Sequence, residues 1–587
     1  MPLDQARTKR NEPQIIPPRN AVLLIVAGVA LSLAILIARH RPATEYEVSI
    51  YAATPSGFWI LAGIALLITT SLSIVTTNRV TRGISISVAG LGIVSIVSLP
   101  IIRGYHYYGE VDAFTHLGVA RDIATGAVTP LEVLYPATHL LAVSHAAVTD
   151  TRLELSMMIG VPIFVIAFLL FVPITIRIIE PGHRAVPIGA IAAMYLLPIN
   201  WIAVHLQAHP SSQAILFSPV IATGLLLVVF QPRLATMTAL VILLVSYVLI
   251  HPMHGVNVVA MVGAVGMAIV LRRRQPIGTR WVDRVAIGAV VIIGGLALFA
   301  WIILTASETL MRFQQTFLLG LEGNPAGDLT QQLDSLATIG AGAGEIFVKL
   351  FLVSAVFCVV AGLLMGLAFM RHWVLDQPTE TKRDDIISYL AIGFLPIAGL
   401  FAVYFFAGME PYEFRQLGFA MAIVTIIGAV AIARVDGTLL SALPRPAAST
   451  VLLCVLIPLL IASVLVIHSS PFIFLPSAHV PEAQVSGFET SFEFREPEVP
   501  MAYVRSDPAR YSDAIHGEVA HARYDFYGGE LDRSVPDRFA DRDREPIAYR
   551  GLRFTTDDFD SLDRDQRIDR LHSNGQYDLY RVGWGGG

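Results

Sequence analysis

Residues 21–37 read Ala21-Val-Leu-Leu-Ile-Val-Ala-Gly-Val-Ala-Leu-Ser-Leu-Ala-Ile-Leu-Ile37 and carry no charge over 17 positions. A helix that crosses the apolar core of a bilayer needs about 17–25 such residues. The stretch is longer than the apolar core of a secretory signal peptide, and no small-x-small cleavage pattern follows it. We therefore expect an uncleaved membrane anchor at this position.

Further segments of the same kind follow along the chain, which gives thirteen predicted spans. Their approximate limits are 21–37, 58–75, 84–102, 157–178, 185–200, 212–230, 234–250, 255–271, 285–304, 346–370, 386–406, 417–433 and 451–468. A shorter apolar stretch, 135–148, is expected to lie along the interface. The sequence thus predicts an all-α polytopic membrane protein, with a domain of another kind at its C-terminus.

The composition of the 587 residues agrees with this class. The chain is 54% hydrophobic and 15% charged, whereas soluble proteins carry about 25% charged residues, which excludes an ordinary cytosolic enzyme. The net charge is only −5 and no basic run is present, so we expect no nucleic-acid partner. The two cysteines, Cys358 and Cys454, lie in apolar blocks and predict neither a disulfide framework nor a thiolate metal site.

The distribution of positive charge orients the predicted bundle. With the N-terminus in the cytoplasm, the inner loops hold 19 lysines and arginines and the outer loops hold 7, as the positive-inside rule requires. Residues 1–20 then form a cytoplasmic tail and 21–469 form the bundle, with large outer loops at 103–156 and 305–345. An odd number of spans places the C-terminus outside a cell (plasma) membrane.

Residues 470–587 differ in composition from the bundle. They contain 22 acidic residues against 14 arginines and no lysine, a net charge of −8. Alternating runs at 491–494 and 576–582 predict strands, and Asn574-Gly575 predicts a hairpin turn. We expect a small extracytoplasmic domain, α/β or mostly β. Its acidity fits either a halophilic archaeal protein or any acidic exposed domain.

Unusual polar residues collect on the outer side of the predicted bundle, and no Walker A, GxGxxG, HExxH or GxSxG motif accompanies them. The first outer loop carries Glu110-Val-Asp112 and His116 directly after the third span. Partial desolvation at this depth is expected to raise the pKa of both carboxyl groups. On one helix, Asp112 and His116 share a face.

Asp112 permits three interpretations. Its carboxylate can take a proton from an acceptor hydroxyl, with Glu110 and His116 beside it. Together with Glu110 it can hold a divalent cation such as Mg²⁺ or Mn²⁺. It can also simply cap a helix that starts at Ala113.

Other outer turns supply histidines and cations. His205 with His209 and His251 with His254 have two-ligand spacing but no third ligand, so we favour hydrogen-bonding histidines. The predicted substrate-binding residues are Tyr412, Glu413 and Arg415 in the turn before the span 417–433, Lys349 near the outer end of the span 346–370, and Arg312 in the outer loop 305–345. The Arg415 guanidinium suits a lipid phosphate, unless it pairs with Glu410 or Glu413. Lys349 is a second phosphate ligand or a snorkelling lysine, and loop 305–345 is a movable lid or a plain connector.

Many spans, Glu110-Val-Asp112 in a large outer loop and a trailing outer domain resemble the GT-C class of membrane glycosyltransferases. The resemblance implies a sugar donor on a polyprenyl phosphate and a catalytic carboxylate at Asp112. It also implies membrane lipid as a partner and a glycan, lipid or protein as the acceptor, as in cell-surface glycosylation. In that class the acidic motif usually follows the first span, so this chain has an added N-terminal hairpin.

Elementary chemistry leads to the same expectation. Sugar nucleotides stay in the cytoplasm, so glycosyl transfer on the outer face needs a lipid-borne donor, a cation for its phosphate and a carboxylate base. Single displacement with inversion is the expected mechanism. The alternatives are a lipid or solute transporter or flippase, which would carry ionisable groups at mid-depth, and a non-catalytic scaffold of the GT-C fold.

Overall fold

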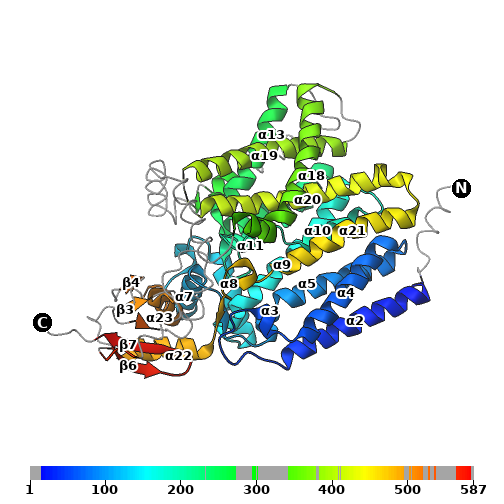
Figure 1. Cartoon of the computed structure of the whole chain (residues 1–587). Coiled ribbons are helices and arrows are strands. Elements are labelled where there is room, and N and C mark those ends of the chain that lie inside the picture. The colour runs from blue at the N-terminus through cyan, green and yellow to red at the C-terminus, as the bar shows by residue number, and fades with distance from the viewer. Residues whose placement is uncertain are drawn as a thin grey trace.

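The computed structural model describes residues 15–231, 233–272, 294–298, 300–301, 342–377, 382–407, 409, 411–494, 501–503, 506–519, 526–528, 535–536, 564–566 and 568–582. Long helices form a bundle, and the C-terminal strands β6 and β7 lie at the left end of it with helices α7 and α23 (Figure 1). The candidate site described below is built at this end.

Within the described residues, nine helical segments are long and apolar enough to cross a membrane, as predicted for a polytopic membrane protein. They comprise α2 (Pro18–Arg39), α4 (Ser56–Val75), α5 (Arg79–Val97), α9 (Leu153–Ile179), α11 (Pro210–Phe230), the run of α17 (Ala343–Ile346), η2 (Phe347–Phe351), α18 (Leu352–Phe369) and η3 (Met370–Val374), then α19 (Lys382–Phe406), α20 (Tyr412–Thr438) with η4 (Leu440–Ala442), and α21 (Arg445–Val464). Of these nine, α20 is the most buried, which makes it the central helix.

Three further apolar stretches coincide with other predicted spans: α10 (Ala185–Met194), α12 (Leu234–Ile250) and the part Pro252–Ala268 of α13 (Pro252–Arg272). The prediction of one spanning helix over 185–200 is wrong. Ten residues rise only about 15 Å, half the thickness of the bilayer core. Helix α10 ends because Leu196 takes a positive φ of 48°, which breaks the helical path. The predicted span 285–304 lies mostly outside the described residues, so a total of thirteen stays a prediction.

The first outer loop is mostly structured. Its elements, with the short pieces that precede it, are α3 (Ile50–Ala53), α6 (Leu99–Ile102), β1 (Tyr107–Tyr108), α7 (Asp112–Thr125), η1 (Pro130–Glu132) and α8 (Pro136–Thr149). The apolar stretch 135–148 forms the helix α8, with Pro136 at its first position, where its fixed φ and missing N–H cost nothing. Its place along the membrane interface stays a prediction. Gly126 ends α7 with a positive φ of 77°, the usual conformation after a helix.

The described part of residues 470–587 contains both helices and strands. The elements are η5 (Pro471–Ile473), β2 (His479–Val480), α22 (Glu482–Phe494), β3 (Met501–Tyr503), α23 (Pro508–His516), β4 (Phe526–Gly528), β5 (Val535–Pro536), β6 (Ile568–Ser573) and β7 (Asp578–Val582). The β6–β7 pair is antiparallel and turns at Gly575, whose φ is +87°, as the Asn574-Gly575 pattern predicted. The strand predicted at 491–494 is wrong, because these residues are the last turn of α22.

This C-terminal part shares its core with the first outer loop. β2 pairs antiparallel with β1, and Phe488 stacks on Tyr511 with ring centroids 3.9 Å apart. The ring of Tyr511 also lies 4.6 Å from that of Phe114 in α7. These side chains belong to the same buried cluster as those of the bundle. Whether residues 470–587 can also fold alone stays a prediction.

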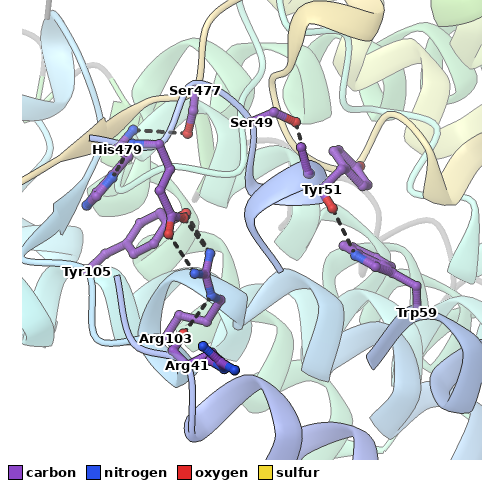
Figure 2. Close-up of polar contacts among 10 residues, drawn as sticks. Arg41, Ser49, Tyr51, Trp59, Arg103, Tyr105, Ser477 and His479 are labelled. Atoms are coloured by element: carbon purple, nitrogen blue, oxygen red, sulfur yellow. Dashed lines mark hydrogen bonds and ion pairs between the residues drawn. The ribbon is translucent and has the colours of Figure 1, made fainter. Parts of the chain in front are cut away.

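A buried ion pair fixes the chain that leads into α7. The Arg103 guanidinium binds both carboxylate oxygens of Glu47, with Nη2 at 2.6 Å from Oε1. The Tyr105 hydroxyl also donates to Glu47, and the Tyr105 ring stacks on His479 with centroids 3.7 Å apart. Figure 2 shows Arg103 and Tyr105, both from the segment that follows α6, close to His479 of β2. The loop after α2, the end of α6 and strand β2 are thereby held together.

Candidate functional site

Helix α7 starts at Asp112 after a strained residue. Its N-cap is Val111, with φ 50° and ψ −108°, a conformation that β-branched residues almost never adopt. No side chain caps the helix, so the interpretation of Asp112 as the cap of a helix starting at Ala113 is wrong. Asp112 is instead the first helical residue, where a negative charge is favoured by the helix dipole.

Three nitrogen groups from distant parts of the chain surround the Asp112 carboxylate. His209 Nε2 and an Arg415 Nη2 lie 3.5 Å from Oδ2, and Arg510 Nη2 lies 3.5 Å from Oδ1. The carboxylate remains 44% exposed, whereas the Arg415 side chain is 16% exposed. The two guanidiniums thus bracket one carboxylate that is still open to a reactant.

The residues of the site, with the nearby Tyr135, lie at the N-terminal ends of helices. Asp112 is the first residue of α7, Tyr135 is the N-cap of α8 and His209 is the N-cap of α11. Arg415 and Arg510 lie in the first turns of α20 and α23. Each such end carries about half a positive charge and unpaired N–H groups. Together with two arginines, they make a region of positive potential that suits an anion such as a phosphate.

Buried histidines continue the site behind Asp112. His116 Nδ1 lies 3.3 Å from His139 Nε2, and the His116 ring is 5.3 Å from that of His209. The Tyr135 ring stacks on His251, which directly precedes α13, at 5.2 Å. Asp112 and His116 therefore share a face of α7, as their spacing predicted, and both contact His209.

The next histidine, His254, is a hydrogen-bonding residue. Its Nε2 lies 2.9 Å from Ser211 Oγ, and its Nδ1 lies 3.5 Å from Asn257 Nδ2. Asn257 donates in turn to Gln416 Oε1 at 2.9 Å. Among the described residues, no three His, Cys, Asp or Glu side chains are placed to hold a metal ion. A divalent cation held by Glu110 and Asp112 stays a prediction.

The neighbours of Asp112 hold it in the ionised form. The hydrogen bond from His209, followed by the charges around it, lowers the pKa of Asp112 well below its usual range and outweighs burial. The expected rise in the pKa of Asp112 is therefore wrong. Burial lowers the pKa of both His116 and His209, so these imidazoles are neutral at neutral pH and donate hydrogen bonds without adding charge.

The structure also describes the contacts of the other residues predicted for this site, Glu110, Tyr412 and Glu413. The Glu110 backbone amide donates to Gln207 Oε1 at 3.2 Å. The Arg415 guanidinium lies 5.6 Å from the centre of the Tyr412 ring, a cation–π distance. Glu413 is buried in the first turn of α20. The ion pair described for Arg415 is the one with Asp112, while Glu410 lies outside the described residues.

Two predicted cations are not placed beside Asp112 by the structure. The Lys349 ammonium pairs with Glu345 at 2.6 Å and lies over the rings of Phe472 and Phe474 at 4.6 and 4.4 Å. It lines a hollow of about 380 Å³, including its open mouth, among apolar residues of the bundle. Arg312 lies outside the described residues, as does most of the outer loop 305–345.

Two members of the site were not identified as such from the sequence. His209 was predicted to be a hydrogen-bonding histidine of an outer turn and was not counted among the site residues. Arg510 carries no signal, because it is one of 14 arginines in an acidic segment, and only the docking of α23 on α7 brings it to Asp112.

The strain at Val111 leads to a prediction about stability. Val111 is 59% exposed, so replacing it removes little packing. Val111→Gly should raise the free energy of unfolding by about 1 kcal/mol, since left-handed strain costs about 1–3 kcal/mol and glycine loses part of that gain in entropy. Thermal unfolding in detergent would measure this. Val111→Ala, which keeps the strain, is the control, and a glycine variant less stable than the alanine variant would contradict the prediction.

No protein-family model matches the chain, and no curated protein has a detectably similar sequence.

Proposed function

We propose that the chain is a membrane glycosyltransferase that moves a sugar from a polyprenyl-phosphate carrier to an acceptor on the outer face of the cell membrane. The observation that carries the proposal is the bracketing of Asp112 by Arg415, Arg510 and His209 at one end of a bundle of apolar helices. An exposed carboxylate and cations for a phosphate are the two groups that such a transfer needs side by side.

The proposed reaction is a single displacement. The acceptor hydroxyl oxygen bonds to the anomeric carbon while the bond from that carbon to the phosphate oxygen breaks. Asp112 takes the hydroxyl proton, and the polyprenyl phosphate leaves with the electron pair of the broken bond. The transition state resembles an oxocarbenium ion, so the attacking oxygen becomes strongly acidic as it bonds. A carboxylate of low pKa can therefore accept its proton.

The cationic side of the site serves the leaving group. Charge grows on the phosphate as its bond to the sugar breaks, and fixed cations and helix N-termini stabilise that charge without reorganising. Arg415 suits this role because it lies in the first turn of the central helix α20 and is mostly buried. Its position at a helix start next to an apolar bundle allows the lipid tail to remain among the helices.

The orientation that accompanies this proposal has the N-terminus in the cytoplasm and residues 470–587 outside, as the positive-inside rule favours. A transporter or flippase, and a scaffold without activity, remain as outcomes of the experiment below. A scaffold would bind lipid phosphate without turnover, and a flippase would move the carrier across the bilayer without consuming it.

Arg415→Ala tests the role of the buried cation. We expect the KM for a polyprenyl-phosphate sugar to rise by about 10- to 100-fold, the effect of losing one hydrogen bond between charged groups. The measurement is the initial rate of transfer by purified protein in lipid nanodiscs at several donor concentrations. Arg39→Ala, at an exposed residue in the last turn of α2, is the matched control and should behave as wild type. An unchanged KM in Arg415→Ala would remove Arg415 from the donor site.

A cellular arm tests the proposed function itself. A strain lacking the chain should have altered surface glycans that wild-type protein restores and Arg415→Ala restores only in part. Unaltered glycans in the deletion strain would favour a transporter or scaffold.

A further inference from the structure

We infer that Arg510, from the C-terminal part of the chain, is the second arm of a phosphate clamp whose first arm is Arg415 in the membrane bundle. This inference rests on the proposed function, because it takes the ligand to be the phosphate of a polyprenyl carrier. It adds a role for residues 470–587, which would then supply a binding residue to a site otherwise built from the bundle and the first outer loop.

The first argument is the placement of the two guanidiniums. Arg415 approaches Oδ2 of Asp112, and Arg510 approaches Oδ1 of the same carboxylate. One small planar anion therefore bridges both arginines. A phosphate monoester has oxygens at similar spacing and carries more charge, so it can bridge the same pair.

The second argument is that the Asp112 carboxylate is too far from the two guanidiniums to form hydrogen bonds of normal length with them. Both contacts are 3.5 Å long, whereas a charge-assisted hydrogen bond from a guanidinium to a carboxylate is about 2.7–2.9 Å. The Nε of Arg415 is buried, and among the described residues this donor has no hydrogen-bond partner. A buried donor normally has a partner, so the Arg415 Nε indicates that a ligand with an acceptor oxygen completes the site.

The third argument is that Arg510 is held in position. Its Nη1 donates to Thr115 Oγ1, and that hydroxyl donates to Asp513 Oδ2 at 2.7 Å. Asp513 lies one turn after Arg510 in α23 and also faces its guanidinium, at 4.0 Å. The side chain is therefore oriented by α7 on one side and by its own helix on the other, which lowers the entropy lost when it binds an anion.

The fourth argument is the tight docking of α23 on α7. A Cβ on Gly118 would overlap the carbonyl of Asp513, so only glycine permits this approach. Arg121 Nε donates to the Ala514 carbonyl at 2.9 Å, and the Val519 amide donates to Asp122 Oδ2 at 3.2 Å. These contacts do not involve Arg510, so α23 should stay docked when Arg510 is replaced.

The experiment measures binding and does not depend on turnover. Full-length protein is placed in nanodiscs that contain graded amounts of undecaprenyl monophosphate, and bound lipid is counted by native mass spectrometry. Undecaprenol, which lacks the phosphate, and inorganic phosphate, which lacks the chain, are run in parallel to separate the two parts of the ligand. The variants are Arg510→Gln, Arg510→Lys and, for rescue by added guanidinium, Arg510→Ala. Arg581→Gln, at an exposed residue of β7, is the matched loss of charge elsewhere in the C-terminal part.

We expect Arg510→Gln to weaken binding of undecaprenyl monophosphate by about tenfold, the loss of one hydrogen bond to a charged group, with Arg510→Lys intermediate and Arg581→Gln as wild type. Thermal unfolding and protease resistance check that α23 stays docked. If Arg510→Gln loosens it, millimolar guanidinium should restore binding to Arg510→Ala, and failure to do so would overturn the inference.

Two further outcomes separate the inference from the proposed function. Wild-type affinity in a well-folded Arg510→Gln protein would overturn the role of Arg510 and leave the proposed function standing. Wild-type protein that binds undecaprenyl monophosphate no better than undecaprenol would overturn both.

Discussion

Asp112→Asn should lower sugar transfer by roughly two to four orders of magnitude, the contribution of a general base. Asparagine keeps the size of the side chain but cannot accept a proton. The loss should fall on kcat. The KM for the donor should not rise, because the exchange removes a negative charge that competes with the phosphate for Arg415 and Arg510.

The control for this substitution is Asp150→Asn. Asp150 is an exposed residue at the C-terminal end of α8 in the same outer loop, with a φ of 55° that asparagine also tolerates. Asp150→Asn makes the same chemical change in the same outer loop and should leave the rate of sugar transfer unaltered. Full activity in Asp112→Asn, with equal amounts of folded protein, would exclude Asp112 as the base.

Arg103→Ala should destabilise the protein by about 3–5 kcal/mol, because it leaves the charge of Glu47 buried without its partner. Arg103 is 3% exposed and Glu47 is 13% exposed, so solvent cannot replace the lost ion pair. Tyr105 still donates to Glu47, but one neutral hydrogen bond does not compensate a buried charge. Thermal and denaturant unfolding in detergent would measure the loss.

The double variant Arg103→Met with Glu47→Leu sharpens this prediction. Replacing both charges by apolar groups removes the unpaired charge, so the double variant should be clearly more stable than Arg103→Ala. Equal destabilisation in the single and double variants would mean that packing around Arg103, not its charge, holds this region together.

The membrane fold could be predicted from the sequence because apolar side chains in uninterrupted runs require a bilayer, whatever else they contact. The ends of the helices could not be predicted as well, because each end depends on the backbone conformation of one or two residues. Helix α10 ends just before Leu196, which takes a positive φ. The amino-acid composition of the segment does not predict this conformation. The residues 491–494 alternate like a strand, yet they continue α22 because a helix that has started at Glu482 propagates easily.

The candidate site could be predicted in part. Sidedness placed Asp112, His209 and Arg415 at one face, because every second loop of a polytopic protein lies on the same side of the membrane. The strain at Val111 and the contact of Arg510 with Asp112 could not be foreseen. The first depends on the backbone path between β1 and α7, and the second joins residues almost 400 positions apart through the docking of α23.

The structure changes the role expected for residues 470–587. Composition separates residues 470–587 from the bundle, and the acidic charge alone would make them a detached solubilising domain. In the structure, Tyr511 and Phe488 pack into the core that contains Phe114 of the candidate catalytic helix. Removing this part of the chain would therefore expose α7 and disturb the site, whether or not the isolated segment folds.

The most direct test of the central claim is the turnover of a lipid-linked sugar by the purified protein. Wild-type protein in nanodiscs is incubated with polyprenyl-phosphate mannose and polyprenyl-phosphate glucose that carry radiolabelled sugar, together with membrane extract as a source of acceptor. We predict label on an acceptor, with stoichiometric release of free polyprenyl phosphate, and neither product in Asp112→Asn. Donor that stays intact with wild-type protein for every sugar tried, while the same preparation binds undecaprenyl monophosphate, would contradict the proposed transfer.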